Sequence, residues 1–462
     1  MESARVRHRR PDLTASALES LDLQGLLHAA AKPSWRHADV LVEESLELTC
    51  HFADSAVGDA TTAADRGICV RCITDEGLAY RSADRVGPET IRDLLGGLEH
   101  GEAPTPRATS PAASPVDEEL DVSGFFALLT RIDKAARDVD PRIRQVTIDA
   151  EHRLRRATIA TLDRGPVEER RRLVYLTIRI VATERGRVAT GFSTPATSGH
   201  DDDLDEEAIG REVARRALVG LQARPAPIAH LPVVVGPGRG MVLVHEACCH
   251  PLEADEVLRG SIYAARVGEP IASPLLSIVD DPLLPGAAGT YAVDDEGTPA
   301  APTTLVEGGV LRSFLTDTVT ALRLDARRTG NGRRQSYRHS ALPRMSNTCV
   351  LAGDSNPADV VADTKRGIYA EHVGGGEVVE STGDFVFRVT NGYLIENGVL
   401  TDPIEETTLR GNGARVLLEV DAVGNDVRPG AAKCAKHGHV LPVGLSGPTV
   451  RIRSLLVGGT AA

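Results

Sequence analysis

The sequence has few aromatic residues and no long apolar run. Phenylalanine and tyrosine occur seven times each and tryptophan once, whereas glycine occurs 44 times in 462 residues. This balance favours a sheet-rich protein with many tight turns, because glycine permits the backbone conformations that such turns need. No apolar run approaches the roughly 18 residues that a membrane-spanning helix requires. The basic N-terminal segment, MESARVRHRRPDL, is not followed by an apolar stretch, so we expect no secretory signal.

An excess of positive charge is also lacking. The formal net charge is −13 at neutral pH, which argues against nucleic acid or an anionic membrane surface as the main partner. The seven cysteines form no repeated clusters, and an odd number fits a reducing cytoplasm better than a disulfide framework. Cys69 and Cys72 form a C-x-x-C pair. They lie in an alternating, strand-like run without a second pair, and we interpret them as structural.

The length and composition predict a globular chain with more than one domain. We expect an α+β fold in which a mixed α/β N-terminal domain, residues 1–226, precedes a β-rich, antiparallel or barrel-like catalytic domain, residues 227–462. The boundary follows a predicted helix that the sequence Arg224-Pro-Ala-Pro227 ends. Residues 100–116 are rich in proline, alanine and serine, which predicts a flexible loop within the first domain.

Hydrophobic periodicity places the main elements. Amphipathic spacing predicts helices at residues 14–31, 123–138 (with Ser123 as N-cap), 205–223 and 357–369. Alternation predicts strands around residues 40–42 and at 67–80, 173–182, 188–192 and 231–235. Gly-Gly and Asn-Gly pairs predict two similar hairpins, at residues 305–311 and 394–400.

The stretch Met241–Asp255, MVLVHEACCHPLEAD, carries the strongest chemical signal. An apolar, strand-like run, residues 241–244, leads into His245 and Glu246, and His250 follows. Imidazoles beside a carboxylate are typical of metal-dependent hydrolysis, in which the imidazoles hold zinc and the carboxylate takes a proton from water.

The spacing H-E-x-x-x-H is one residue longer than the familiar H-E-x-x-H signature. On a regular helix, residues i and i+5 point roughly 140° apart, against roughly 40° for i and i+4. His245 and His250 can therefore share a metal only if the helix is distorted, for example by a π-bulge. Pro251 favours such a distortion. The alternative is a helix with one buried and one solvated histidine.

Further segments of the chain occur in the same order as similar segments in a known family. The chain resembles the TldD/PmbA metalloproteases, in the zinc-bearing TldD branch, in HEACCHPLEAD and in the segments that follow it. These segments are Tyr263–Glu269, Asp294–Pro299, Thr329–Arg333, Pro343–Thr348, Lys365–Tyr369, Gly374–Gly376, Gly411–Gly413, Pro442–Gly444, Gly447–Ile452 and Val457–Thr460. The resemblance covers essentially all of residues 230–462 and, more weakly, the first 200.

A catalytic zinc usually has three protein ligands, and Cys434, His437 and His439 are chemically suitable as the third. The resemblance implies Cys434, since the family uses a cysteine just before a V-P-V-G-type segment. Ala435 departs from the family's usual Cys-Gly-Lys-x-Gly. His437 and His439 would then orient ligands, contact substrate or lie exposed in a loop.

Other residues near the motif have less certain roles. We expect the cysteines between the two histidines, Cys248 and Cys249, to fill the core. Glu253 or Asp255 could accept a hydrogen bond from a ligand histidine and fix its tautomer, or serve a plain structural role. The residue that stabilises the oxyanion is left open among Tyr337, His339 and Arg344.

The resemblance implies a zinc-dependent peptidase with one Zn²⁺ per active chain, Glu246 as the catalytic base, and unfolded or small peptides as substrates. It also implies a role in peptide maturation or specialised metabolism, and a heterodimer with a TldE/PmbA-like subunit that lacks the zinc motif. The alternative, that this chain is itself the non-catalytic partner, is disfavoured because His245, Glu246, His250 and Cys434 are all present. A metal-storage or redox role has little support, because the cysteines do not cluster.

Overall fold

The computed structural model describes residues 21–98, 120–379 and 381–458. The predicted loop at residues 100–116 and the first part of the helix predicted at residues 14–31 lie outside the described residues. Between the ends of the described chain, a long antiparallel sheet is followed by a β-rich C-terminal half. The expected α+β class is confirmed. None of the described helices is long and apolar enough to cross a membrane.

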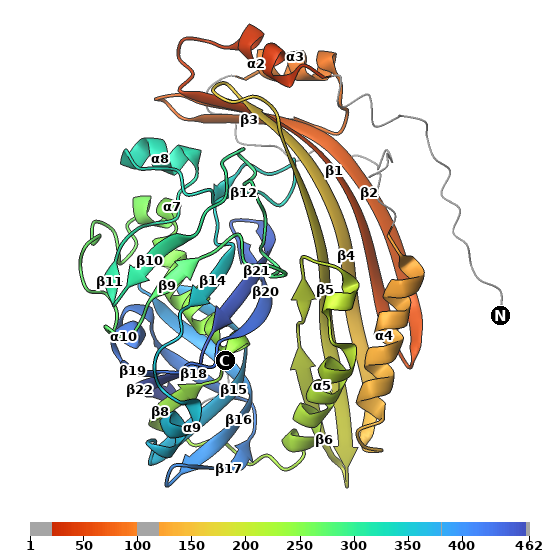
Figure 1. Cartoon of the computed structure of the whole chain (residues 1–462), viewed down its shortest axis with the longest axis vertical. Coiled ribbons are helices and arrows are strands. Elements are labelled where there is room, and N and C mark those ends of the chain that lie inside the picture. Colours follow the sequence, from red (N-terminus) through yellow and green to blue (C-terminus); the bar gives the residue numbers. More distant parts are fainter. Residues whose placement is uncertain (1–20, 99–119, 380, 459–462) are drawn as a thin grey trace, which may run out of the picture.

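The N-terminal sheet arches over the C-terminal half (Figure 1). Its strands lie in the order β3-β2-β1-β4-β5-β6, and β7 pairs with β5. The bounds are β1 His37–Ala53, β2 Ala56–Ile73, β3 Leu78–Ala83, β4 Ile143–Thr161, β5 Val167–Glu184, β6 Arg187–Ser193 and β7 Ala196–Thr197. Strands of 17 to 19 residues are long enough to reach from one end of the molecule to the other.

Both faces of β1 are covered, which explains its almost continuous burial. Ala38 and Val40 pack with helices α2 (Leu23–Ala30) and α3 (Pro88–Gly96), and Leu48 packs with α4 (Val122–Arg137) and α5 (Glu206–Gly220). The intervening residues, such as Leu41, point the other way, toward the C-terminal half. The N-cap of α4 is Asp121 and not Ser123, because the Asp121 carboxylate accepts from the Gly124 amide.

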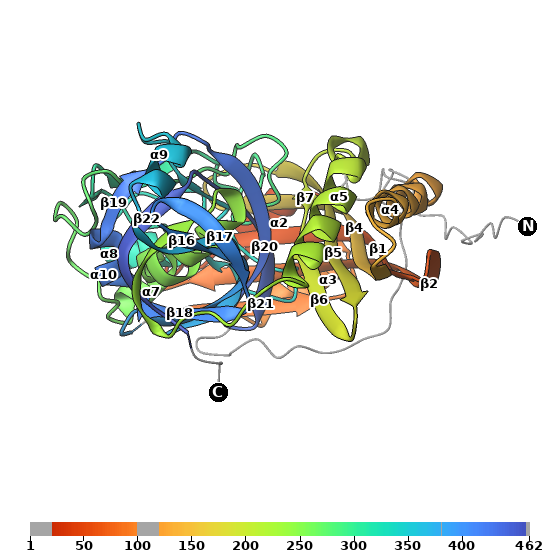
Figure 2. The same ribbon diagram turned by 90° about the horizontal axis from the view of Figure 1, so that it is seen from below.

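The C-terminal half contains a barrel, seen as a ring in Figure 2. Five strands close it in the order β15-β8-β22-β18-β16, with β16 returning to β15, while β17 and β19 extend it. The bounds are β8 Ala229–Val235, β15 Arg366–Val379, β16 Asp384–Glu396, β17 Val399–Ile404, β18 Thr407–Asn412, β19 Val420–Val423 and β22 Val450–Val457.

A second sheet, in the order β11-β10-β9-β14-β21-β20, packs against the barrel. It comprises β9 Ile278–Asp280, β10 Thr303–Glu307, β11 Val310–Leu311, β14 Asn347–Val350, β20 Arg428–Lys436 and β21 His439–Gly447. The remaining short elements are β12 Gly332–Arg333, β13 Leu342–Pro343, α7 Ala254–Leu258, α8 Thr318–Leu324, α9 Pro357–Ala362 and α10 Gly413–Leu418. Both predicted hairpins are confirmed, and their turns have positive φ at Gly308, Gly309, Asn397 and Gly398.

The single strand predicted at residues 67–80 is wrong, because β2 ends at Ile73 and turns back into β3, with which it pairs. Two predicted elements of the C-terminal half are also wrong, and both errors come from the barrel. The helix predicted at residues 357–369 ends at Ala362, because the chain from Arg366 pairs with β8 and β16. The run Met241–Val244 is helical and not a strand. It lies among barrel residues where it has no strand partner, and a helix satisfies its own backbone groups.

Candidate metal centre

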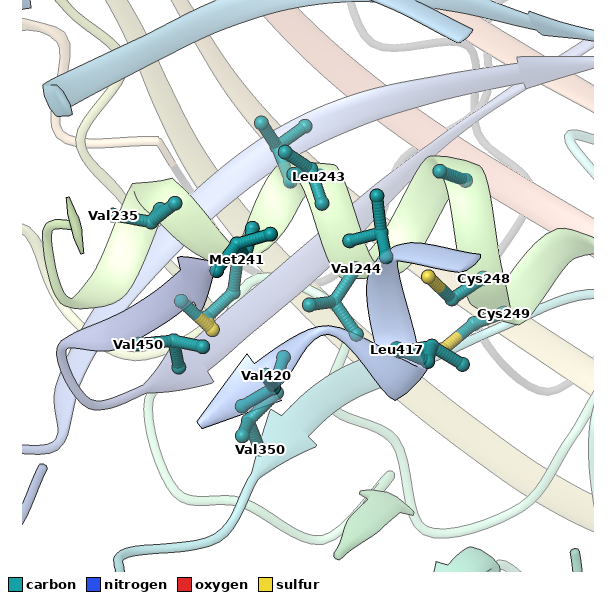
Figure 3. Close-up of a cluster of buried hydrophobic side chains, with 14 of the residues drawn as sticks. Val235, Met241, Leu243, Val244, Cys248, Cys249, Val350, Leu417, Val420 and Val450 are labelled. Atoms are coloured by element: carbon teal, nitrogen blue, oxygen red, sulfur yellow. The ribbon is translucent and has the colours of Figure 1, made fainter. Parts of the chain in front are cut away.

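The H-E-x-x-x-H motif lies on a helical segment whose apolar side chains form one core cluster with residues of the barrel strands. Figure 3 shows part of this cluster, including Leu243 and Val244 of the segment, Val450 of β22 and Val420 of β19. The segment begins as a 3₁₀ turn, η2 (Gly238–Met241), and continues as α6 (Val242–Val244). A π-helical turn, η3 (His245–Cys249), and a second 3₁₀ turn, η4 (His250–Leu252), follow. The Gly-rich stretch at residues 236–240 thus leads into this segment.

The π turn brings the two histidines to the same side of the segment. The His250 amide donates to the His245 carbonyl, so one turn contains one residue more than an α-helical turn. The two imidazole centroids lie 5.1 Å apart, with the rings nearly perpendicular. On a regular helix, two histidines with this spacing would point in different directions. The local change of helix type brings them to the same side. Both histidines are buried, so the alternative with one solvated histidine is wrong.

Cys434 reaches the same place from β20, 184 residues further along the chain. Its Sγ lies 3.1 Å from His250 Nε2, and Glu246 Oε2 lies 3.1 Å from the same nitrogen. One ligand atom from each of His245, Glu246, His250 and Cys434 lies within 4.8 Å of the others. The structure thus brings together the four residues that the sequence singled out.

The donor set fits a metal ion. His245 Nε2 is buried and has no hydrogen-bond partner, whereas His245 Nδ1 lies 2.8 Å from Thr348 Oγ1. The Thr348 hydroxyl donates to Met345 Sδ, so its oxygen accepts from Nδ1–H and the Nε2 lone pair is left free. His250 donates from Nδ1 to Glu253 Oε2, at 2.8 Å, which likewise frees its Nε2.

The electrostatics favour a thiolate at Cys434. Burial opposes ionisation, but the charge on His250, its hydrogen bond to the thiol and the nearby His245 lower the pKa of Cys434 to about 5. The pKa of His250 is raised against the effect of burial, because Cys434 and Glu253 stabilise its cation. Burial also opposes ionisation of Glu246, but the hydrogen bond from His250 and the charge on His245 lower its pKa. The thiolate of Cys434 and the carboxylate of Glu246 are therefore poised to bind a cation, and a metal ion bound there would take the place of the proton on His250 Nε2.

Glu253 is the carboxylate that orients His250. It is fully buried, and besides His250 it accepts from the Met345 amide at 3.0 Å and from Lys436 Nζ at 2.7 Å. Arg344 lies behind the same group and donates to the Cys434 carbonyl at 2.9 Å. Of the three residues considered for the oxyanion, Arg344 is therefore the one that contacts the surroundings of the four-residue cluster.

The other two candidates lie elsewhere. The Tyr337 hydroxyl donates to Asp65 of the N-terminal sheet, at 3.1 Å. His339 packs against His439, with ring centroids 4.9 Å apart. His439 is buried, which corrects the interpretation of it as an exposed loop histidine, and burial together with the charge on His339 lowers its pKa to about 3.

Asp255, Glu256 and His437 form a second group of potential ligands, within 4.8 Å of one another. Two cations already neutralise its carboxylates. Lys436 Nζ lies 2.7 Å from Asp255, and Arg259 lies 2.7 Å from Glu256. We interpret the group as an ion-pair cluster that ties the β20–β21 turn to α7, with the half-exposed His437 at its edge.

The remaining cysteines are structural in character. Cys248 and Cys249 are fully buried among apolar residues (Figure 3), as expected, and burial raises the pKa of both thiols. Cys69 and Cys72 belong to different clusters on opposite faces of β2. All seven cysteines are free thiols.

Comparison with known proteins gives matches along most of the chain. Three family models match in order: PmbA/TldA metallopeptidase domain 1 at residues 38–97, the central domain at residues 111–221 and the C-terminal domain at residues 229–459. A Haemophilus influenzae protein named "Metalloprotease TldD homolog" is 31% identical, covering 97% of this chain and 98% of its own.

Two further relatives bear on the metal and the fold. A Saccharolobus solfataricus protein named "Zinc metalloprotease TldD homolog" is 31% identical over 56% of this chain and 58% of its own. The crystal structure of TldE from Thermococcus kodakarensis superposes with a TM-score of 0.75. It shares 18% identity and covers 96% of this chain and all of its own length, so the likeness concerns the fold.

Proposed function

Because the chain belongs to the PmbA/TldD metallopeptidase family, we propose that it is a zinc-dependent peptidase that hydrolyses peptide or amide bonds. In this proposal His245, His250 and Cys434 bind the metal and Glu246 is the catalytic base. One observation carries the assignment. Two distant parts of the chain place these four side chains so that one ligand atom of each lies within 4.8 Å of the others.

The choice of metal rests on the donor set. Two imidazoles and one thiolate suit zinc, and three protein ligands leave a position open, as in catalytic zinc sites. The name of the Saccharolobus solfataricus relative is in keeping with this choice. We propose one zinc ion per active chain, and such an ion would supply the Lewis acidity that activates water and polarises a carbonyl.

Each residue then has a role that its surroundings support. Thr348 and Glu253 hold the imidazoles of His245 and His250 as Nδ1–H tautomers, with Nε2 toward the metal. Glu246, with a lowered pKa, is ionised near neutrality and accepts a proton at Oε2. The same carboxylate then returns the proton to the leaving amine. Arg344 holds the Cys434 carbonyl and thereby the strand that carries the thiolate.

We propose unfolded chains or small peptides as substrates, in peptide maturation or specialised metabolism. The three proposed ligands are buried, and the His250 side chain is 4% exposed, whereas the Glu246 side chain is 22% exposed. A carboxylate that is only narrowly accessible can be reached by a thin, extended chain but not by the surface of a folded protein. This supports a substrate without tertiary structure.

We also propose a heterodimer with a TldE/PmbA-like subunit. The support is the shared fold with a solved TldE, together with a full set of ligands in this chain. Seven free, buried thiols favour a reducing compartment, and we propose the cytoplasm.

The test is hydrolysis of a pool of unfolded peptides, by this chain alone and with a co-expressed partner. We expect activity that a chelator removes and zinc restores. Glu246→Gln should lower turnover by a factor of about 10² to 10⁴, the usual contribution of general acid–base catalysis, while zinc stays bound. Metal-loaded protein that cleaves no peptide, with or without the partner, would instead support the non-catalytic role.

A further inference from the structure

A cleft of about 1240 Å³ lies where the N-terminal sheet meets the barrel. Its wall includes Thr194 from the end of β6, Arg216 from α5, Arg239 from η2, His372 from β15 and Ala431 from β20. The four residues of the candidate metal centre are not among its lining residues. The cleft is therefore a separate feature, and its charged groups have no role in the chemistry described above.

Arg239 is the unusual member of this wall. Its guanidinium donates to Thr194 Oγ1, at 2.6 Å, and to the Ala431 carbonyl, and it lies 5.7 Å from the centre of the Phe192 ring. Its Nε is buried without a hydrogen-bond partner. Among the described residues, no carboxylate lies within ion-pair distance of Arg239. A desolvated cation whose direct contacts are all neutral is costly. Burial lowers the pKa of Arg239, and the more distant charge of Glu246 offsets this only in part, so an anion is the missing direct partner.

A neighbouring arginine shows the contrast. Arg216 lines the same cleft, and its Nε lies 3.2 Å from the Glu212 carboxylate. Arg215 in turn pairs with Glu212 and Glu371. Glu212 and Glu371 thus have arginine partners. Asp203 accepts from the His200 amide, and Asp426 accepts from the Thr449 hydroxyl. In the described part of the chain, Arg239 has no ion-pair partner.

A second polar group in the wall lacks a partner. His372 is 2% exposed, and its pKa is lowered by burial and by the charges of Arg216 and Arg239, so the ring is neutral. Thr390 donates its hydroxyl proton to the His372 carbonyl. The Thr390 oxygen, 2.7 Å from His372 Nδ1, therefore accepts from that nitrogen. His372 Nε2 is left as a buried acceptor without a donor.

The helical segment and β20 each connect the cleft to the candidate metal centre, and the distance between cleft and centre is similar along both. Arg239 and Glu246 are seven residues apart on one helical segment, so they lie on nearly the same face and roughly 10 Å apart along its axis. Ala431 and Cys434 are three residues apart on β20, which is again roughly 10 Å. An extended peptide rises about 3.3 Å per residue, so about three residues span this distance.

We propose that Arg239 binds a carboxylate of the peptide substrate, about three residues from the bond that is cleaved. The carboxylate is either the C-terminal α-carboxylate or the side chain of an aspartate or glutamate, and His372 Nε2 accepts a main-chain N–H near it. This inference rests on the proposed peptidase function and specifies its substrate: the site selects peptides that carry an anion at a fixed distance from the scissile bond.

The test compares three peptides of one sequence with three residues after the scissile bond. The first has a free C-terminal carboxylate, the second a C-terminal amide, and the third an amide with aspartate as the last residue. For the wild-type protein we expect kcat/KM to be roughly ten- to hundredfold higher for the first or the third than for the second, mainly through KM, as for hydrogen bonds to charged groups. A preference for the first peptide identifies the C-terminal α-carboxylate as the bound group, and a preference for the third identifies a side-chain carboxylate.

Arg239→Gln should abolish this preference, so that the acid and amide peptides are cleaved with similar kcat/KM. Arg239→Lys should restore part of it. Arg388→Gln removes an exposed arginine that pairs with Glu406 on the barrel surface, and it should keep the full preference. Peptide binding to the Glu246→Gln protein provides a readout that needs no turnover and should show the same dependence on Arg239.

Two results would overturn the inference. One is equal cleavage and equal binding of the acid and amide peptides by the wild-type protein. The other is a preference that Arg239→Gln leaves intact. If the wild-type protein cleaves none of the peptides with or without its partner, the peptidase function itself fails. Binding to the Glu246→Gln protein then decides separately whether Arg239 recognises a carboxylate.

Discussion

At the scale of single residues, the candidate metal centre depends on side chains that do not bind the metal. Thr348 and Glu253 determine which nitrogen of each imidazole carries the proton, and so which nitrogen is free to bind. Lys436 and Arg344 compensate the buried charge of Glu253, with Lys436 Nζ at 2.7 Å. A change in this surrounding layer should therefore weaken metal binding even though all ligands are kept.

Glu253→Gln tests this layer. Glutamine keeps the shape but removes the charge that holds His250 as the Nδ1–H tautomer, so we expect metal affinity to fall about 10- to 100-fold. The measurement is a competition titration with a zinc chelator. Asp255→Asn is the matched control, because Asp255 also pairs with Lys436 but touches no ligand histidine. Equal losses in both variants would mean that Glu253 acts only through Lys436.

The sequence predicted part of this residue-level picture. His245, Glu246 and His250 were identifiable from their chemistry and order, and Cys434 from family resemblance. Thr348 was not, because a threonine in a buried strand has no sequence pattern that distinguishes a hydrogen bond to histidine from ordinary packing. Glu253 and Asp255 were equivalent in sequence, and only the fold places Glu253 against His250.

At the scale of elements, the π turn His245–Cys249 is the feature on which the site depends. It is packed against α10, where Gly413 approaches the turn closely. A Cβ atom on Gly413 would lie 2.0 Å from the Ala247 carbonyl oxygen. The absence of a side chain at Gly413 therefore allows the π turn to keep its position.

Gly413→Ala should displace the π turn. Overpacking of this kind costs about 1–3 kcal/mol of unfolding free energy, and here it should also weaken zinc binding, because the displaced turn carries the metal-binding histidines. The measurements are urea unfolding and zinc affinity. Gly375→Ala is the control, since a Cβ there meets nothing within 4 Å. Unchanged zinc affinity in Gly413→Ala would show that the turn tolerates displacement.

Element prediction succeeded where local chemistry decides the structure and failed where the barrel does. The spacing of His245 and His250 predicted a helical distortion only on the condition that both bind one metal, whereas both hairpins followed from two-residue turns. Residues 241–244 were misassigned because a short apolar run fits either state, and residues 363–369 because their two apolar residues, Ile368 and Tyr369, are too few to show a period. Their surroundings in the barrel, which are distant in sequence, select helix for the first and strand for the second.

At the scale of the whole molecule, the N-terminal sheet and the C-terminal half are joined by buried ion pairs. Asp295 lies on the C-terminal side and pairs with Arg155 at 2.6 Å and Arg171 at 3.1 Å, which belong to β4 and β5. Asp39 and Arg71 extend the contact and reach Arg334 and Glu296. Whether the two parts also fold separately, with a boundary between residues 226 and 227, stays a prediction.

Asp295→Asn tests this joint and its pH dependence. Burial opposes ionisation of Asp295, but Arg155 and Arg171 lower its pKa below the ordinary value of 3.8. A lowered pKa stabilises the fold above pH about 4, and this contribution falls as the pH drops further. We expect a loss of about 3–5 kcal/mol at pH 7 that shrinks toward pH 3, measured by urea unfolding.

The control for this joint is Asp402→Asn, which breaks an exposed pair with Arg224. It should change stability by no more than about 0.5 kcal/mol at either pH. A loss in Asp295→Asn that is the same at pH 3 and pH 7 would mean that the charge of Asp295 does not stabilise the joint.

The central claim is that two distant parts of the chain form one zinc site, and metal content tests it most directly. Elemental analysis of the wild-type protein, prepared with its partner subunit if necessary, should find one zinc per chain. Cys434→Ala should lose most of it, whereas Cys349→Ala, which removes another buried thiol, should keep it. Equal zinc in all three proteins, or none in the wild-type heterodimer, would contradict the account.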